Sequence, residues 1–202
     1  MSVAPVVSPS PLQTLLADPA LLHTSHPAEL LTLAFQIQHN LRYQHSWSEL
    51  RLHTHSPITN RPLPRPLVSG LPPLRLYVHP EEQIELLKEA EKRRKAAAAT
   101  ATAAKTEAGE DAAPDATLEY KPEPEREWIL PTRLSEKWSL KRLSEVFDAI
   151  DLVPAGPEPA AGEAAAVNKW RTTKRLVLAT VDSDSTVVYY IVHDGVVKPR
   201  QN

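Results

Sequence analysis

The chain has 202 residues and contains no cysteine. It can therefore form neither a disulfide framework nor a thiolate metal site, which suits a reducing, intracellular compartment. The formal net charge is only −2, so any nucleic-acid contact must come from a local basic patch or from a partner subunit. No apolar run approaches the ~20 residues that a membrane-spanning helix needs. The N-terminus lacks the basic start of a secretory signal.

Proline is abundant instead, with 20 residues that cluster in a few segments. We expect a flexible leader over residues 1–25 and a single domain over residues 26–202. Two stretches rich in alanine, glutamate and proline, at about 99–125 and 153–168, have few large apolar residues and are predicted to be disordered insertions. Without these segments roughly 130 residues remain, an ordinary size for one hydrophobic core.

Three helices are predicted from apolar residues at helical spacing. The first runs from Pro27 to about Tyr43, the second begins at Pro80, and the third has Ser139 as its N-cap. The buried face of the third helix is expected to contain five apolar residues, namely Leu140, Leu143, Val146, Phe147 and Ile150.

Strands are predicted at residues 47–54, 74–78, 127–131, 176–181 and 186–192. The prolines between residues 56 and 73 would confine any strand there to a sheet edge. Together these elements predict an α/β or mixed α+β domain, with a mixed sheet flanked by about three helices.

The last two predicted strands are apolar on both faces. In the first, Val177, Ala179 and Val181 alternate with Leu176 and Leu178. In the second, Val187, Tyr189 and Ile191 alternate with Val188, Tyr190 and Val192. Strands of this kind are normally covered on both sides, either by helices or by another protein.

Three segments together resemble a known family: VDSDSTVVYYIVHDGVV, WSELRLHTHSPITNRPLPRPLVSGLPP and LPTRLSEKWSLKRLSEVFDAI. They are similar to the fungal form of the small non-catalytic subunit of the eukaryotic tRNA-splicing endonuclease, the subunit called Sen-fifteen. The resemblance implies a fold like the catalytic domain of archaeal tRNA-intron endonucleases. It also implies a nuclear complex of four subunits that excises introns from precursor tRNA, leaving 2′,3′-cyclic phosphate and 5′-hydroxyl ends. Two subunits cut, and the other two hold them in place.

The resemblance assigns docking roles to the C-terminal region. Asp182 and Asp184 lie in the loop expected to reach the opposite catalytic half, although from the residues alone they are ordinary turn formers. Tyr189, Tyr190, Val196 and Val197 are candidate interface residues, with core packing as the alternative for some of them. We expect an interface for the tail and core packing for most of residues 187–192.

Neither a metal site nor a catalytic set is predicted. His45, His53 and His55 are close in sequence but lack a third ligand at a recognisable spacing. The catalytic subunits of the family use a tyrosine, a histidine and a lysine. Tyr77 and His79 share one short segment, LYVHP, which does not match the catalytic motifs. No catalytic residue and no cofactor is carried over.

Three arginines, Arg61, Arg65 and Arg75, are candidate RNA contacts near the proline-rich segment. The main hypothesis is a structural subunit that pairs with a catalytic subunit and forms a homodimer when isolated. One alternative is a stand-alone RNA-binding adaptor that uses these arginines, and another is an active nuclease. Co-expression, sizing and a cleavage assay separate the three.

Overall fold

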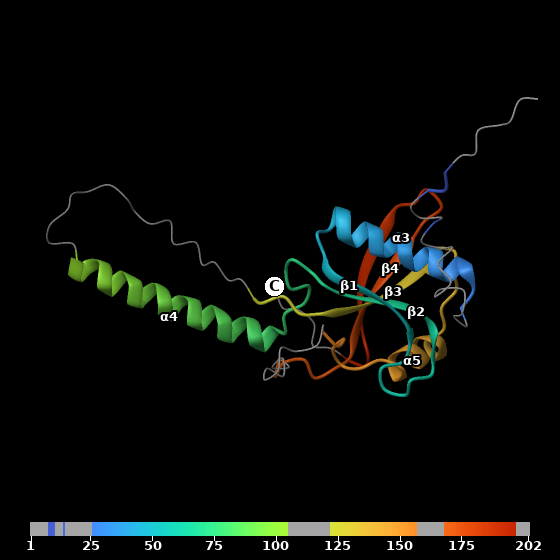
Figure 1. The fold of residues 1–202 in the computed structure, drawn as a ribbon. Coiled ribbons are helices and arrows are strands. Elements are labelled where there is room, and N and C mark those ends of the chain that lie inside the picture. The colour runs from blue at the N-terminus through green and yellow to red at the C-terminus, as the bar shows by residue number, and fades with distance from the viewer. Residues whose placement is uncertain (1–7, 11–13, 15–25, 105–121, 157–167, 197–202) are drawn as a thin grey trace, which may run out of the picture.

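The computed structural model describes residues 8–10, 14, 26–104, 122–156 and 168–196. Five strands form one mixed sheet in the order β1-β2-β3-β4-β5 (Figure 1). They are β1 (Ser48–His55), β2 (Pro62–Leu71), β3 (Glu127–Arg133), β4 (Arg175–Val181) and β5 (Val187–His193). β3 and β4 run parallel, and the other neighbouring strands are antiparallel. The structure thus confirms the predicted mixed α/β class.

Helix α3 (Ala28–Gln44) covers one face of the sheet. Its buried residues include the adjacent pair Leu33 and Ala34, and Ile37 and Leu41 follow at intervals of three or four positions, so one stripe of the helix faces the strands. On the sheet side this core contains residues from β2, β3 and β4, namely Val68, Ile129, Val177, Ala179 and Val181. The predicted face of β4 is therefore confirmed.

Helix α5 (Leu140–Asp148) covers the opposite face. The Ser139 side chain accepts a hydrogen bond from the backbone N–H of Arg142, as the N-cap prediction requires. Val146 and Phe147 pack with Leu176 and with residues of β2 and β3 in a second core. Leu140 was wrongly predicted to be buried: it is 87% exposed, because the first residue of the helix points past the sheet.

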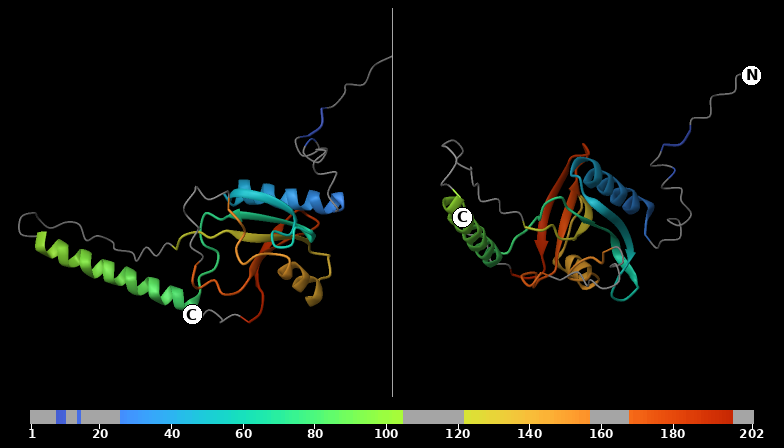
Figure 2. Two further views of the ribbon diagram at one scale, coloured as in Figure 1. Left: turned by 60° about the horizontal axis from the view of Figure 1, so that its bottom comes forward. Right: turned by 60° about the vertical axis from the view of Figure 1, so that its left-hand side comes forward.

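Helix α4 (Pro80–Ala104) begins at the predicted proline and projects away from the sheet in every view (Figure 2). It reaches past residue 99, where the first insertion was predicted to begin. Residues 105–121 and 157–167, and most of the predicted leader, lie outside the described part of the chain. The predicted flexibility of these segments stays a prediction.

Two strand predictions need correction. Residues 74–78 form no strand, and Leu74 is 57% exposed. The proline-rich segment does form a strand, β2, which lies inside the sheet and not at its edge. The pairing of β2 with β3 explains why prolines are tolerated in an inner strand. β3 pairs with β2 only at residues 68–70, beyond the three prolines of the strand. Over its proline half, β2 therefore has only β1 beside it and behaves as a local edge.

Candidate docking surface at the last strand

The β4–β5 hairpin has an uninterrupted register, from Arg175 opposite His193 to Val181 opposite Val187. An acidic turn, residues 182–186, closes it. The backbone N–H of Asp182 donates to the carbonyl oxygen of Thr186 at 2.9 Å, and the N–H of Ser185 donates to the carbonyl oxygen of Asp182 at 3.1 Å. Ser185 has a φ of 70°, the left-handed conformation that tight turns often need.

Both carboxylates of this turn also help to build it. An oxygen of Asp182 accepts the N–H of Ser183 at 2.6 Å, and an oxygen of Asp184 accepts the N–H of Thr186 at 2.8 Å. The hydrogen bonds from Thr186 lower the pKa of Asp184. The whole turn is exposed, so both carboxylates remain open to solvent on one side. Turn formation and docking are therefore compatible roles.

Strand β5 is the last strand of the sheet, so the outer side of its backbone is unpaired within the described residues. Three large apolar side chains on it are exposed: Val188 (43%), Tyr190 (56%) and Ile191 (40%). Val187 and Tyr189 are half-buried toward α3, and the Tyr189 hydroxyl donates to Asn40 at 2.5 Å. We expected core packing for most of residues 187–192, and this was wrong, because no residue of β5 is fully buried.

The opposite edge of the sheet, β1, is protected in ways that β5 is not. Its register is broken twice by bulges, and Glu49 has a positive φ. The side chains of Gln38 and His26 contact the carbonyl oxygens of Leu50 and Thr54. Natural sheets protect exposed edges with bulges, charges and cover. β5 carries no Lys, no Pro and no bulge, which is typical of a strand that another chain completes.

Buried ion pairs fix the base of the hairpin. Arg175 contacts Glu127 through Nε at 3.0 Å and Glu125 through Nη2 at 2.6 Å. Arg171 contacts Glu127 through Nη2 at 3.1 Å. Burial alone would raise the pKa of Glu125, but a hydrogen bond from Asn168 and the charges of the neighbouring arginines together lower it. This cluster joins β4 to the segment that enters β3.

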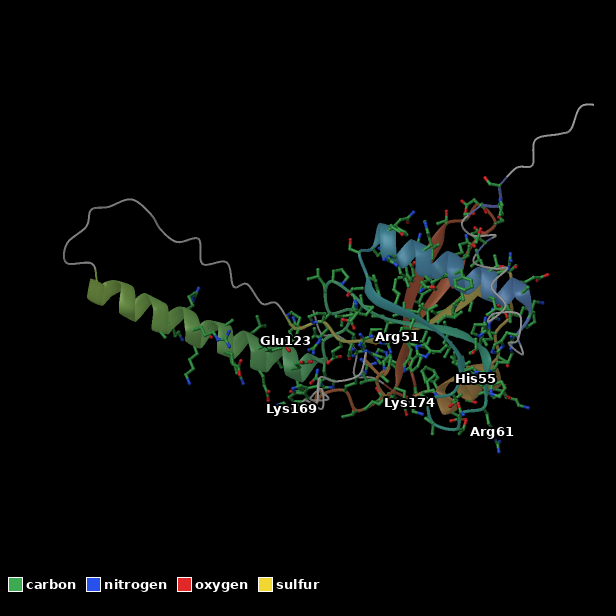
Figure 3. All side chains as sticks on the ribbon, in the orientation of Figure 1. Arg51, His55, Arg61, Glu123, Lys169 and Lys174 are labelled. Carbon is green, nitrogen blue, oxygen red and sulfur yellow. The ribbon has the colours of Figure 1, made fainter. Side chains whose placement is uncertain are left out.

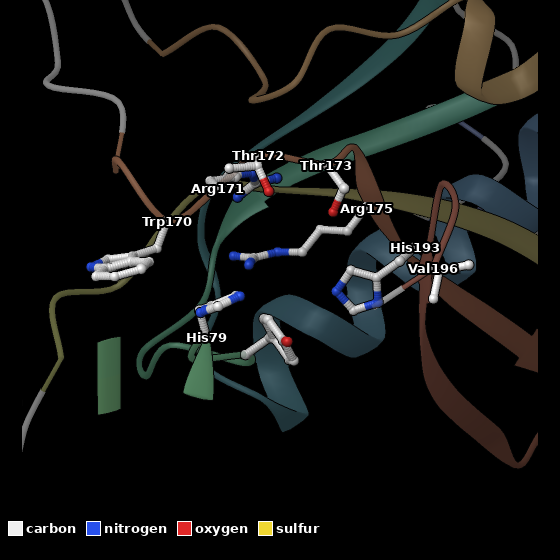
Figure 4. Close-up of a pocket in the computed structure, with 9 residues that line it drawn as sticks. His79, Trp170, Arg171, Thr172, Thr173, Arg175, His193 and Val196 are labelled. Carbon is white, nitrogen blue, oxygen red and sulfur yellow. The ribbon is translucent and has the colours of Figure 1, made fainter. Parts of the chain in front are cut away.

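A small hollow lies beside this cluster, at the end of β5 (Figure 4). Tyr77 and His79, which match no catalytic motif in the sequence, both line it together with His193 and Arg175. The rings of Tyr77 and His193 meet edge to face, with centroids 4.8 Å apart. His79 stacks on Trp170 at 5.3 Å. Sequence reasoning did not group these residues, because they come from segments more than 90 residues apart.

Comparison with known proteins identifies the family. A family model described as "Sen15 protein" matches residues 36–202. A probable tRNA-splicing endonuclease subunit, tsp-1, from Neurospora crassa is 40% identical over 205 residues, covering 100% of this chain and 79% of that protein. The chain belongs to the Sen15 family. A probable tRNA-splicing endonuclease subunit, sen15, from Schizosaccharomyces pombe is 37% identical over 76 residues, covering 38% of this chain and 50% of that protein.

The arginines proposed as RNA contacts occupy different environments in this Sen15-family chain. Arg65 is buried, pairs with Glu136 and donates to the carbonyl oxygen of Pro131 at 3.1 Å, where β2 and β3 have separated. Arg75 pairs with Glu82 at 2.5 Å and with Glu125 at 2.7 Å. These two are structural ion-pair residues, so they are removed as candidate RNA contacts. Arg61 is exposed on the β1–β2 turn and remains a candidate (Figure 3).

The remaining candidate residues lie in different parts of the structure. Val196 is 98% exposed, which fits an interface residue, while Val197 lies outside the described residues. His53 contacts the Ser69 hydroxyl at 2.7 Å and packs on Trp128.

Within the described ranges, no group of three potential ligands could hold a metal ion. No helix in those ranges is long and apolar enough to cross a membrane.

Proposed function

We propose that this chain is a non-catalytic structural subunit of a tRNA-splicing endonuclease, and that it pairs with a catalytic subunit through β5. The observation that carries the proposal is the unprotected β5 edge with its three exposed apolar side chains. Such an edge supports β-strand addition, in which main-chain hydrogen bonds give affinity and the side chains give specificity. Both relatives are named as probable tRNA-splicing endonuclease subunits, and from this we infer that the partner is another subunit of such an enzyme.

The acidic turn is proposed to set the second contact, with the opposite catalytic half of a heterotetramer. Its two carboxylates lie at the tip of the hairpin that carries the β5 edge. A negative tip that meets a basic groove fixes partner and register through charge complementarity. One hairpin would thus contact two neighbours. The β5 edge would pair with the catalytic subunit, and the acidic turn would contact the opposite catalytic half of the heterotetramer.

The non-catalytic role is supported by the position of Lys174. Metal-free RNA cleavage at a 2′-hydroxyl needs a proton acceptor, a proton donor and a cation near the phosphate. The Nζ of Lys174 donates to the carbonyl oxygen of Phe147 at 2.8 Å, on the α5 side of β4 and away from the hollow.

Co-expression with a candidate catalytic subunit tests the proposal. The expected result is a stable complex that cleaves intron-containing precursor tRNA, while the purified chain alone does not cleave it. Cleavage by the chain alone would favour an active nuclease. Tight, salt-sensitive RNA binding by a well-behaved monomer that recruits no catalytic subunit would favour an RNA-binding adaptor.

Two further parts of the proposal concern the free chain and its location. The same β5 edge, left unpaired, is expected to produce a homodimer of the isolated chain, which sizing at several concentrations would detect. The nuclear location is part of the proposal and rests on the family resemblance alone. A fluorescent fusion that stays outside the nucleus would contradict it.

A further inference from the structure

The hollow beside the ion-pair cluster has a lining that favours one kind of ligand. It contains two arginines, two histidines, two threonines, a tyrosine, a tryptophan and a valine, and no acidic residue: Tyr77, His79, Trp170, Arg171, Thr172, Thr173, Arg175, His193 and Val196. Arg, His, Tyr, Thr and Trp side chains all offer hydrogen-bond donors. A lining of donors without carboxylates is suited to an anion.

Two enclosed polar atoms in the hollow have no partner among the described residues: the Tyr77 hydroxyl oxygen and Nε2 of His193. An unsatisfied buried polar group is costly, and each one in a native protein calls for an explanation such as a bound ion or water. Both residues line the same hollow, and their rings are in contact. Both atoms are closed to solvent in the free chain, so a single ligand would satisfy them by entering between the two rings.

Two more donors are available at the same place. Nδ1 of His79 accepts the backbone N–H of Glu81 at 3.2 Å, so a neutral His79 carries its proton on Nε2 and can donate it to a ligand. Arg175 uses Nε and Nη2 for its carboxylate partners, and its Nη1 makes no hydrogen bond to any described residue. Figure 4 shows the side chains of His79, Arg175 and His193 converging on the hollow from three different segments.

The local charge also favours an anion. Burial lowers the pKa of His193, and the charges of Arg175 and Arg171 lower it further. His193 thus faces two cationic side chains, both of which are paired with Glu125 and Glu127. The hollow has a volume of about 60 Å³, whereas one water molecule needs roughly 10–15 Å³ on the same kind of measure. A tetrahedral phosphate group fits this space, and a nucleobase would need more.

We propose that this hollow binds a phosphodiester group of RNA, held by Tyr77, His79, His193 and Nη1 of Arg175. The choice of RNA as the source of the phosphate rests on the proposed function, because a subunit of a tRNA-splicing complex lies against an RNA backbone. The contact is to the phosphate and not to a base, so it positions the strand without reading its sequence. This phosphate site is separate from the candidate RNA contact at Arg61, which lies in the β1–β2 turn.

Histidine ring resonances of the full chain, followed by NMR, test this site directly. His79→Gln and His193→Gln variants identify the two signals among the eight histidines. The probes are inorganic phosphate, the dinucleoside monophosphate ApA, and ApA with an uncharged methylphosphonate linkage, each titrated to about 10 mM to detect weak binding. We expect both signals to shift with phosphate and with ApA, but not with the uncharged analogue.

Tyr77→Phe separates binding from folding, because it removes only the enclosed hydroxyl. The variant is expected to be as stable as the parent chain or slightly more so, and to bind ApA about tenfold more weakly. Tyr43→Phe, at a tyrosine that is 68% exposed on α3, is the matched control and should change neither property.

Three results would overturn the proposal. Unshifted His79 and His193 signals with phosphate and ApA would show that the hollow binds no anion. Equal shifts with the uncharged analogue would show that the base is recognised. A response to inorganic phosphate without one to ApA would exclude a diester. Tyr77→Phe should still co-purify with a catalytic subunit, so failure of the phosphate site and failure of the assembly proposal give different results.

Discussion

Replacing Tyr190 with lysine should weaken pairing with a catalytic subunit and leave the fold of the chain unchanged. Tyr190 lies in the middle of β5, opposite Leu178 of β4, and is 56% exposed. The substitution removes the largest exposed apolar group of the edge and puts a positive charge where a partner strand must approach. Lysine on an edge strand is one of the ways in which natural sheets prevent such pairing.

The size of the effect follows from the exposed area. An aromatic side chain buries about 150–250 Å² in total, so covering the exposed part of Tyr190 would remove about 80–140 Å² from water. At about 25 cal/mol per Å², this contact contributes about 2–3.5 kcal/mol to pairing. Its loss corresponds to an affinity about 30- to 300-fold weaker. The cost of burying the lysine charge adds to this value.

The assay measures the dissociation constant of each variant with the catalytic subunit and the thermal midpoint of each variant alone. Ile58→Lys is the control, because Ile58 is 51% exposed on the β1–β2 turn, away from β5. We expect weaker binding for Tyr190→Lys only, with both midpoints close to that of the parent chain. Parent-like affinity for a folded Tyr190→Lys chain would refute the reasoning.

Three other perturbations test separate parts of the account. Asp182→Lys combined with Asp184→Lys should prevent the four subunits from co-purifying while the pair with the catalytic subunit survives; recovery of all four would contradict the docking role of the turn. Glu127→Ala should lower the free energy of unfolding in urea by up to about 3–5 kcal/mol, since it removes the more buried of the two carboxylates that pair with Arg171 and Arg175 and leaves them only Glu125; a loss below about 1 kcal/mol, the usual value of an exposed pair, would show that the cluster is not structural. The lowered pKa of Glu125 means that its contribution to stability is present above its unfolded value near 4.5 and is lost as the pH falls through its folded value. Urea midpoints measured across the acid range should therefore fall less steeply for Glu125→Gln than for the parent, and identical slopes would contradict this.

The elements that can be predicted from sequence are those whose signal is local. Helix α3 and strands β4 and β5 have clear apolar periodicity, and the structure places them within one or two residues of the predicted bounds. The apolar character of β5 on both faces correctly indicated a strand in need of cover. It could not show that Val188, Tyr190 and Ile191 are exposed within this chain.

The elements that were mispredicted depend on contacts between distant segments. A strand with three prolines is tolerated inside the sheet because β3 reaches only its far half. The apparent strand signal at residues 74–78 is overridden, because Arg75 is held by Glu82 and Glu125, from α4 and from the segment before β3. No spacing rule in the sequence indicates such a pairing.

The candidate sites divide in the same way. The turn at Asp182 and Asp184 was predictable because turn chemistry is local, and the structure places both in the exposed hairpin turn; their docking role comes from the resemblance and stays a prediction. Arg65 looked like a free cation in a loop and is a buried partner of Glu136. The hollow was missed because Tyr77, Arg175 and His193 meet only after β4 and β5 have paired.

The central claim is that a partner strand completes the sheet at β5. Hydrogen exchange of the β5 amides tests this most directly, when the free chain, held at a concentration at which sizing shows a monomer, is compared with its complex with a catalytic subunit. The outward-facing N–H groups, at alternate residues of 187–193, should exchange quickly in the free monomer and slowly in the complex. Unchanged exchange at these amides in a stable, active complex would show that the partner binds elsewhere and would contradict the account.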